Sequence, residues 1–265
     1  MLILALDTSS KSGSICLARG PKLLDYHIGD SSLTQGERLP GDIHKLLRRN
    51  KLRVSDVDVY AVVTGPGSFT GLRVGIATIQ GLALPNTRTV VPVSTLAVLA
   101  RIGSDSNVSN KKELIAVFMD AGRGEVFTAL YKRTNDVIES DQNPSKSMQS
   151  RGVWQTPIEL NLVGSPTVDS KDKMLDNWKA KIYLDRICLV GDGALLYRRA
   201  LAEGSKNEIR FVDPIPCLAP SLAAIAWEYA MIGGTVLPHA IQPVYIRGSY
   251  VELARERMFD NLRRK

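Results

Sequence analysis

Short apolar runs separated by polar turns open the chain and predict a sheet. The runs at residues 2–6, 14–18 and 22–28 have the length and composition of strands. The polar turn at residues 7–13 is short enough to join the first two runs as a hairpin. We therefore expect an antiparallel meander of three strands at the N-terminus.

Helical spacing follows the meander. Leucine and isoleucine recur three or four positions apart over residues 39–47, which predicts one buried face of a helix with Pro40 near its first turn. Further on, a short strand is predicted at residues 90–93. Ser94 is expected to cap a helix over residues 95–101.

A glycine-rich turn with the sequence GPGSFTG, residues 65–71, joins a buried strand predicted at 59–63 to a long apolar helix. Glycine permits positive φ and a close approach of the backbone, and a helix that begins there directs free N–H groups outward. The helix has two apolar stripes, one made by Leu72, Ile76, Ile79 and Ala83 and the other by Val74, Ala77, Gly81 and Leu84. One stripe can pack on its own sheet, so the other needs a second partner.

The opening pattern recurs after a polar break at residues 103–112. A strand at 114–119, an acidic turn at 120–124 and a return strand at 126–131 repeat the first hairpin. This echo predicts a duplicated α/β fold with two mixed-sheet subdomains.

Later segments complete the second copy. We expect a strand at 187–190, a helix at 194–202 and a last clear helix at 222–231, with irregular structure at 135–152 and 165–185.

These elements predict the domain organisation. The first subdomain takes residues 1–105 and is joined by a helix at 220–233. The second takes residues 112–218, and residues 238–265 form a C-terminal tail.

Composition narrows the functional classes. The net charge of +7 favours an acidic partner such as RNA, but no aromatic residues interleave with the basic clusters to form a stacking platform for bases. The three scattered cysteines suit a reducing compartment. The start has no basic segment typical of a signal peptide, and no apolar run approaches the ~20 residues of a membrane span. We expect a cytoplasmic protein that does not enter a membrane.

Two turns are candidate sites for chemistry. Asp7, Thr8 and Ser9 are suited either to a phosphate loop or to an ordinary hairpin turn. The glycines at 65, 67 and 71 fit neither a Walker loop nor the dinucleotide fingerprint. The three histidines lie far apart in sequence, and we predict neither a metal site nor catalytic residues.

Together these stretches resemble the TsaB (YeaZ) family of tRNA threonylcarbamoyladenosine biosynthesis proteins. The resemblance is carried by LALDTS at residues 4–9, GPGSFTGLRVG at 65–75, VSTL at 93–96 and DAGRGEV at 120–126. GDGA at 191–194, APS at 219–221 and PVYIR at 243–247 extend it toward the C-terminus.

The resemblance implies a duplicated actin-like, Hsp70-like ATPase (ASKHA) fold and a role in making N6-threonylcarbamoyladenosine (t6A) in tRNA. It implies a non-catalytic subunit that binds the transferase TsaD, works with the ATPase TsaE and meets tRNA through the complex. The chain alone is expected to bind no cofactor, while ATP or ADP within the complex stays open. TsaD-type proteins carry a metal-binding His-x-x-x-His that this chain lacks, and residues 33–40 lack the histidine that family members often carry there.

The resemblance also implies a partner interface on two helices. The residues it assigns to that interface are Leu39, Ile43, Leu46, Leu72, Arg73, Gly75, Ile76 and Ile79. Substitution of Gly75 or Ile76 is expected to abolish the complex while the monomer stays folded, and a homodimer through the same helices stays open.

Two other classes of function stay open. One is an actin-like-fold ATPase or kinase acting alone through Asp7, Thr8 and Asp120, with Asp7, Thr8 and Ser9 as nucleotide-binding residues. The other is a tRNA-binding module, which the pI of 9.3 suggests.

Overall fold

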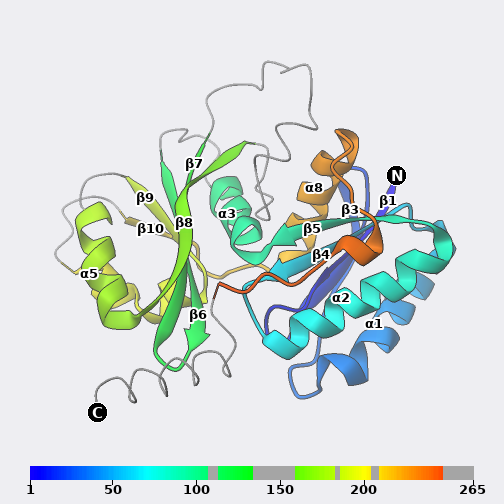
Figure 1. Ribbon diagram of the computed structural model, residues 1–265, viewed down its shortest axis with the longest axis horizontal. Coiled ribbons are helices and arrows are strands. Elements are labelled where there is room, and N and C mark those ends of the chain that lie inside the picture. The colour runs from blue at the N-terminus through cyan, green and yellow to red at the C-terminus, as the bar shows by residue number, and fades with distance from the viewer. Residues whose placement is uncertain (107–112, 134–158, 183–185, 204–208, 247–265) are drawn as a thin grey trace, which may run out of the picture.

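The computed structural model describes residues 1–106, 113–133, 159–182, 186–203 and 209–246, with the side chains of 179–182 left out. These residues form two five-stranded mixed sheets that lie side by side, with helices on their faces (Figure 1).

The first sheet has the order β3-β2-β1-β4-β5. Its strands are β1 (Leu2–Asp7), β2 (Ser14–Arg19), β3 (Lys22–Ile28), β4 (Val59–Gly65) and β5 (Thr89–Ser94). The first three form the predicted antiparallel meander, and β1, β4 and β5 run parallel.

The second sheet repeats this arrangement with the order β8-β7-β6-β9-β10. Its strands are β6 (Leu114–Gly122), β7 (Glu125–Arg133), β8 (Leu160–Ser170), β9 (Ile187–Val190) and β10 (Ile209–Phe211). Again the first three are antiparallel, and β6, β9 and β10 are parallel. The predicted duplication is therefore confirmed.

Strict alternation along the central strands divides the core of the first half. Ile3 and Ala5 of β1 face one side, where α3 (Thr95–Asp105) and α8 (Leu218–Met231) pack. Leu4 and Leu6 face the other side, which α1 (Gln35–Arg49) and α2 (Phe69–Ala83) cover. Helix α3 also contacts β6 and β9, so one hydrophobic cluster joins the two sheets.

Two helices of the first half differ from their predicted bounds. Helix α1 begins earlier than predicted, at Gln35, because Thr34 and Glu37 form a capping box, and this places Pro40 inside the helix. Helix α3 continues to Asp105, into the predicted polar break, and its N-cap residue Ser94 makes no side-chain capping bond.

Other corrections concern the second half and α8. Within the segment predicted as irregular at 165–185, residues 165–182 form the second half of β8 and α5 (Lys171–Ile182), because polar residues suit an exposed edge strand and a surface helix. Residues 183–185 lie outside the described residues. The helix predicted at 194–202 is two short helices, α6 (Asp192–Leu196) and α7 (Arg198–Ala202), and α8 begins at Leu218. Residues 135–152 and 247–265 lie outside the described residues.

Glycines seat α2 directly on the β1–β2 turn. A Cβ atom at Gly71 would lie 2.3 Å from the carbonyl oxygen of Thr8, and one at Gly75 would lie 2.2 Å from its Oγ1. Gly67 has φ +155°, and a Cβ there would lie 2.7 Å from the Cβ and the carbonyl oxygen of Ser9. The turn and the helix therefore meet at a distance that only glycine allows.

We expect Gly75→Ala to lower the free energy of unfolding by about 1–3 kcal/mol, because the added methyl group overlaps Thr8. Gly81→Ala is the matched control in the same helix, since a Cβ atom added there would meet nothing within 4 Å. This control should raise stability by about 0.5–1 kcal/mol. Urea denaturation measures both changes, and equal effects of the two substitutions would contradict the close packing at Gly75.

Candidate functional site

The β1–β2 turn begins with a buried carboxylate. Asp7 Oδ1 accepts hydrogen bonds from the Ser9 backbone N at 2.8 Å and from Ser9 Oγ at 2.6 Å. Burial raises the pKa of Asp7, while the bonds from Ser9 and the nearby charge of Arg38 act in the opposite direction. Thr8 is fully buried against Gly75, and its Oγ1 has no hydrogen-bond partner among the described residues.

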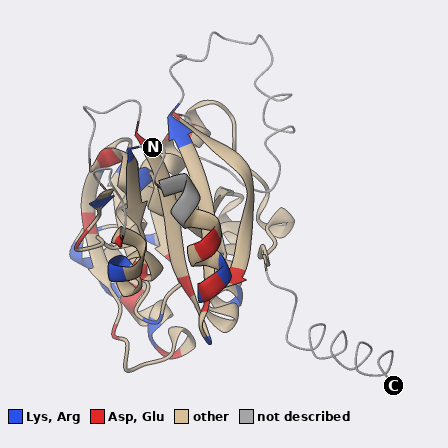
Figure 2. Ribbon diagram, turned by 90° about the vertical axis from the view of Figure 1, so that its left-hand side faces the viewer, with Lys and Arg blue, Asp and Glu red and all other residues tan. Residues whose placement is uncertain are grey.

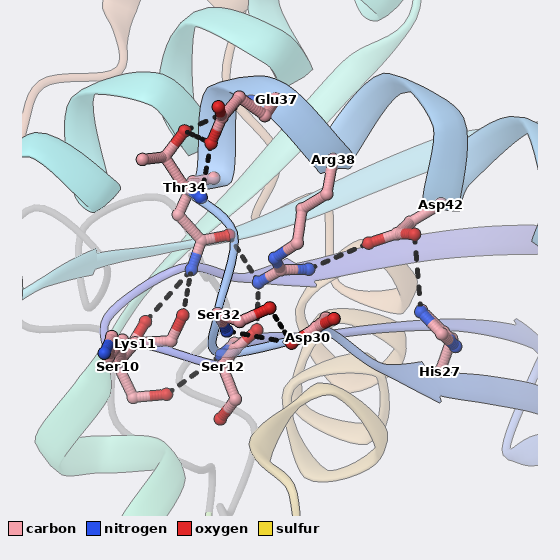
Figure 3. A network of polar contacts seen from close by, with 12 residues as sticks. Ser10, Lys11, Ser12, His27, Asp30, Ser32, Thr34, Glu37, Arg38 and Asp42 are labelled. Carbon is pink, nitrogen blue, oxygen red and sulfur yellow. Dashed lines mark hydrogen bonds and ion pairs between the residues drawn. The ribbon is translucent and has the colours of Figure 1, made fainter.

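Two side chains of α1 clamp the same turn (Figure 3). Gln35 Nε2 donates to the carbonyl oxygens of Ser10 at 3.0 Å and Lys11 at 3.2 Å. The Arg38 guanidinium donates to the carbonyl oxygen of Ser12, to Gln35 Oε1 and to Asp42 Oδ2. The polar inner face of α1 therefore fixes the shape of the turn.

Sequence reasoning missed this clamp. Gln35, Arg38 and Asp42 recur at helical spacing on the buried side of α1. That spacing is the signal that could have indicated a polar stripe on the inner side of α1. The acceptors of Gln35 and Arg38, however, include backbone carbonyl groups, whose positions a sequence does not give.

A cleft of about 280 Å³ lies between the two halves and receives residues from both. Asp7, Ser9 and Ser10 line it from the first half, and Met119 and Asp192 line it from the second. Asp192 Oδ1 accepts from the backbone N of Asp120 and of Gly193, each at 2.9 Å. Asp192 keeps part of its surface exposed, yet desolvation in the cleft raises its pKa.

The structure thus brings the ends of β1 and β9 to one cleft. Thr8 is absent from the cleft lining because it faces α2. The lining contains no Lys or Arg, and the described residues hold no group of three or more His, Cys, Asp or Glu that could bind a metal.

The structure places most of the predicted interface residues inside the first half of the molecule. All of them except Arg73 are buried within the chain itself, in the clusters that cover the first sheet. They face inward because an amphipathic helix packs its apolar stripe on its own sheet first. Gly75 packs on Thr8 and Ile76 lies in the core, so we expect a substitution at either position to lower the stability of the monomer as well. The other residues of α1 and α2 include a set that is exposed.

Those exposed residues form what we call the outer face. On α2 it carries the second apolar stripe, in which Ala77, Gly81 and Leu84 are exposed and Val74 is half-buried, and it begins with Phe69 and Arg73. On α1 it carries Gly36, Pro40, Gly41, His44, Lys45 and Arg48. The predicted division of α2 into two apolar stripes is confirmed.

Three glycines of the outer face are unexplained by the fold of the chain. A Cβ atom added at Gly36, Gly41 or Gly81 would meet nothing within 4 Å. Each exposed glycine inside a helix costs about 1 kcal/mol relative to alanine. Small residues on two adjacent helices allow another helix to approach closely.

The distribution of charged residues does not indicate an RNA-binding surface on the side of the molecule that carries α5 (Figure 2). Figure 2 shows Lys and Arg interspersed with Asp and Glu on the side that carries α5, so the described residues there form no continuous basic surface for RNA. Among the residues that the structure covers, no helix has the length and apolar character needed to cross a membrane.

Comparison with known proteins identifies relatives of this chain in sequence and in structure. A model of the family described as "TsaD: tRNA N6-adenosine threonylcarbamoyltransferase" matches residues 32–149. The tRNA threonylcarbamoyladenosine biosynthesis protein TsaB of Bacillus subtilis is 33% identical over 146 residues, which cover 54% of this chain and 62% of that protein. TsaB of Buchnera aphidicola subsp. Schizaphis graminum is 30% identical over 182 residues, 67% of this chain and 80% of that protein. YeaZ from Pseudomonas aeruginosa has a TM-score of 0.67 and 26% identity, covering 92% of this chain and 99% of that structure.

Two sheets of one topology with a cleft between them define a duplicated α/β protein with two mixed-sheet subdomains, and the expected α/β class and its duplication are confirmed. Within this class, the chain belongs to the TsaB (YeaZ) family. The alignment with the Bacillus subtilis relative spans less than two thirds of that protein.

The buried Asp7 carboxylate gives a pH-dependent prediction. Because burial raises its folded-state pKa, its contribution to stability is full at low pH and is lost as pH rises through that pKa. Asp7→Asn keeps an oxygen that accepts from Ser9 and removes the charge. We expect it to raise the free energy of unfolding at pH 7 and to give no gain below about pH 4, where the unfolded carboxyl is protonated.

Asp25→Asn is the control of opposite sign. Desolvation acts to raise the pKa of Asp25, but hydrogen bonds from Arg49 and Asn50 lower it overall. Its stabilising effect is present at neutral pH, so this substitution should lower stability there. Urea denaturation from pH 3 to pH 8 measures both variants, and destabilisation by Asp7→Asn at pH 7 would contradict the assignment.

Proposed function

We propose that this chain is a non-catalytic subunit of the machinery that makes N6-threonylcarbamoyladenosine in tRNA. In this proposal it acts in the cytoplasm, where it binds and activates a TsaD-type transferase, works with a TsaE-type ATPase and meets tRNA through the complex. Its family membership supports the pathway. The outer face of α1 and α2 is the observation that carries the docking role.

The outer face suits a helical partner. An apolar stripe along α2 lies beside exposed small residues on α1, and the two helices contact each other in the first half of the molecule. Small residues let a second pair of helices approach closely, and burial of the stripe stabilises the complex by about 25 cal/mol per Å². Buried residues of the two helices then hold this surface in place by packing on the first sheet. They are Leu39, Ile43, Leu46, Leu72, Gly75, Ile76 and Ile79.

We further infer that the chain alone holds no nucleotide and that ATP or ADP binds only within the complex. Asp7 accepts its bonds from Ser9, and Gln35 and Arg38 donate to carbonyl groups of the turn. Two carboxylates line the cleft, and the described residues of its lining include no Lys or Arg to balance a phosphate. These features favour an accessory subunit over an enzyme.

Gly81→Arg and Leu84→Arg test the docking face. Both positions are exposed, so neither variant should be less stable than the wild type. We expect each to weaken binding to the TsaD-type protein at least tenfold, a loss of about 1.4 kcal/mol or more. Isothermal titration with the purified transferase measures the affinity.

Leu196→Arg is the matched control, because Leu196 is 61% exposed on α6 and Leu84 is 54% exposed at the end of α2. It should bind normally. Wild-type affinity for both Gly81→Arg and Leu84→Arg would refute the proposed face. Light scattering of the free protein tests whether a second copy occupies it instead.

Titration of the isolated chain with ATP and Mg²⁺ separates the accessory role from that of an independent enzyme. We expect no saturable binding, because among the described residues no Lys or Arg lines the cleft beside Asp7 and Asp192. Tight binding with turnover by the chain alone would favour the ATPase or kinase alternative.

A further inference from the structure

Arg73 is the one predicted interface residue that the structure leaves exposed, and its side chain is held in place. Its Nε donates to the Tyr245 hydroxyl at 3.0 Å. Its Cζ lies 3.8 Å from the centroid of the Phe69 ring, and the Phe69 and Tyr245 rings are 5.1 Å apart. The guanidinium is therefore fixed by a stacking contact and by a hydrogen bond.

Tyr245 reaches Arg73 from far away in the sequence. The segment from Val236 to Ile246 crosses the first half, where Val236 pairs with Val90 of β5. Gln80 Nε2 donates to the carbonyl oxygen of Pro238 at 2.9 Å, and Val244 N donates to that of Thr64 at 2.8 Å. Figure 1 shows this segment, in orange, beside α2. Anchors near both ends of the segment hold Tyr245 in position.

The charge of Arg73 is not balanced within the described structure. Arg38, Arg49, Arg88, Arg101, Arg198 and Arg210 each form an ion pair with a carboxylate. No carboxylate of the described residues lies within ion-pair distance of Arg73, and only its Nε makes a hydrogen bond there. Within the described residues, its terminal N–H groups are therefore left without an acceptor and can bind an anion.

The position of Arg73 indicates the kind of anion. Phe69, Arg73, Ala77 and Gly81 follow one another every four residues along the outer face of α2. Exposed Lys45 and Arg48 on α1 add positive charge to this face, while Glu37 is an exposed acidic residue of the same helix. A helix packed along α2 would complement this surface if it carried an acidic residue at the level of Arg73.

We propose that Arg73, held by Phe69 and Tyr245, binds a carboxylate side chain of the protein that docks on the outer face. The inference rests on the proposed function and adds to it the acidic chemistry of the partner and a role for the C-terminal segment. Because the arginine is already ordered, little side-chain entropy is lost when the carboxylate binds. A bidentate pair with a planar guanidinium also makes the contact specific for arginine.

Two conservative substitutions test this proposal in the full chain. Arg73→Lys keeps the charge and removes the planar fork, and Tyr245→Phe keeps the ring and removes the hydroxyl that holds the fork. We expect affinity for the TsaD-type protein to fall about tenfold for the first and about threefold for the second. The loss should appear mainly as faster dissociation in surface plasmon resonance.

Arg199→Lys, at an exposed position on α7, is the control and should bind like the wild type. Thermal unfolding should be unchanged in all three variants. Normal affinity of Arg73→Lys together with lost binding by Gly81→Arg would overturn this inference and leave the proposed function in place. Normal affinity of both would instead refute the docking face.

A phosphate of tRNA is the alternative anion. Fluorescence polarisation with labelled, unmodified tRNA and the assembled complex distinguishes it. If Arg73→Lys weakens binding of the tRNA but leaves the affinity for the transferase unchanged, the carboxylate assignment is wrong.

Discussion

The backbone of α2 approaches the β1–β2 turn more closely than any side chain allows, because Gly67, Gly71 and Gly75 present only hydrogen at the contact. This contact places α2 directly over Thr8 and Ser9. It directs Leu72, Ile76 and Ile79 into the core and leaves the opposite stripe of the helix exposed. The turn is held from a second side by Gln35 and Arg38 of α1. The outer face of α2 and the cleft lining therefore depend on the same packing.

Glycines serve two purposes in this molecule, and the structure separates them. At positions 67, 71 and 75 a side chain would collide with the turn, so the fold itself explains the residue type. At positions 36, 41 and 81 there is open space, so the fold does not explain it. The second group lies on the outer face, the surface that we propose binds a partner, and each of these glycines lowers the stability of its helix.

Local patterns predicted much of the architecture. Short apolar runs identified β1 and β4 as strands, and the repeated strand–acidic turn–strand unit identified the duplication, because both signals lie in local residue patterns. The segment at 165–185 was misjudged, since its polar residues suit an exposed edge strand and a surface helix as well as a loop. The start of α1 was missed because Thr34 and Glu37 set it through a capping box outside the apolar stripe.

The sequence by itself determined the class of fold, the family motifs and the existence of two apolar stripes on α2, since each is a matter of residue type and spacing. Tertiary structure alone decided which stripe is buried, because both stripes are apolar and only the packing of α2 on the sheet selects one of them. Only the fold could show that Thr8 faces α2 and that Asp7 and Asp192 share a cleft. It also brought Tyr245 onto Arg73 from 172 residues away, a contact that depends on the path of the whole chain.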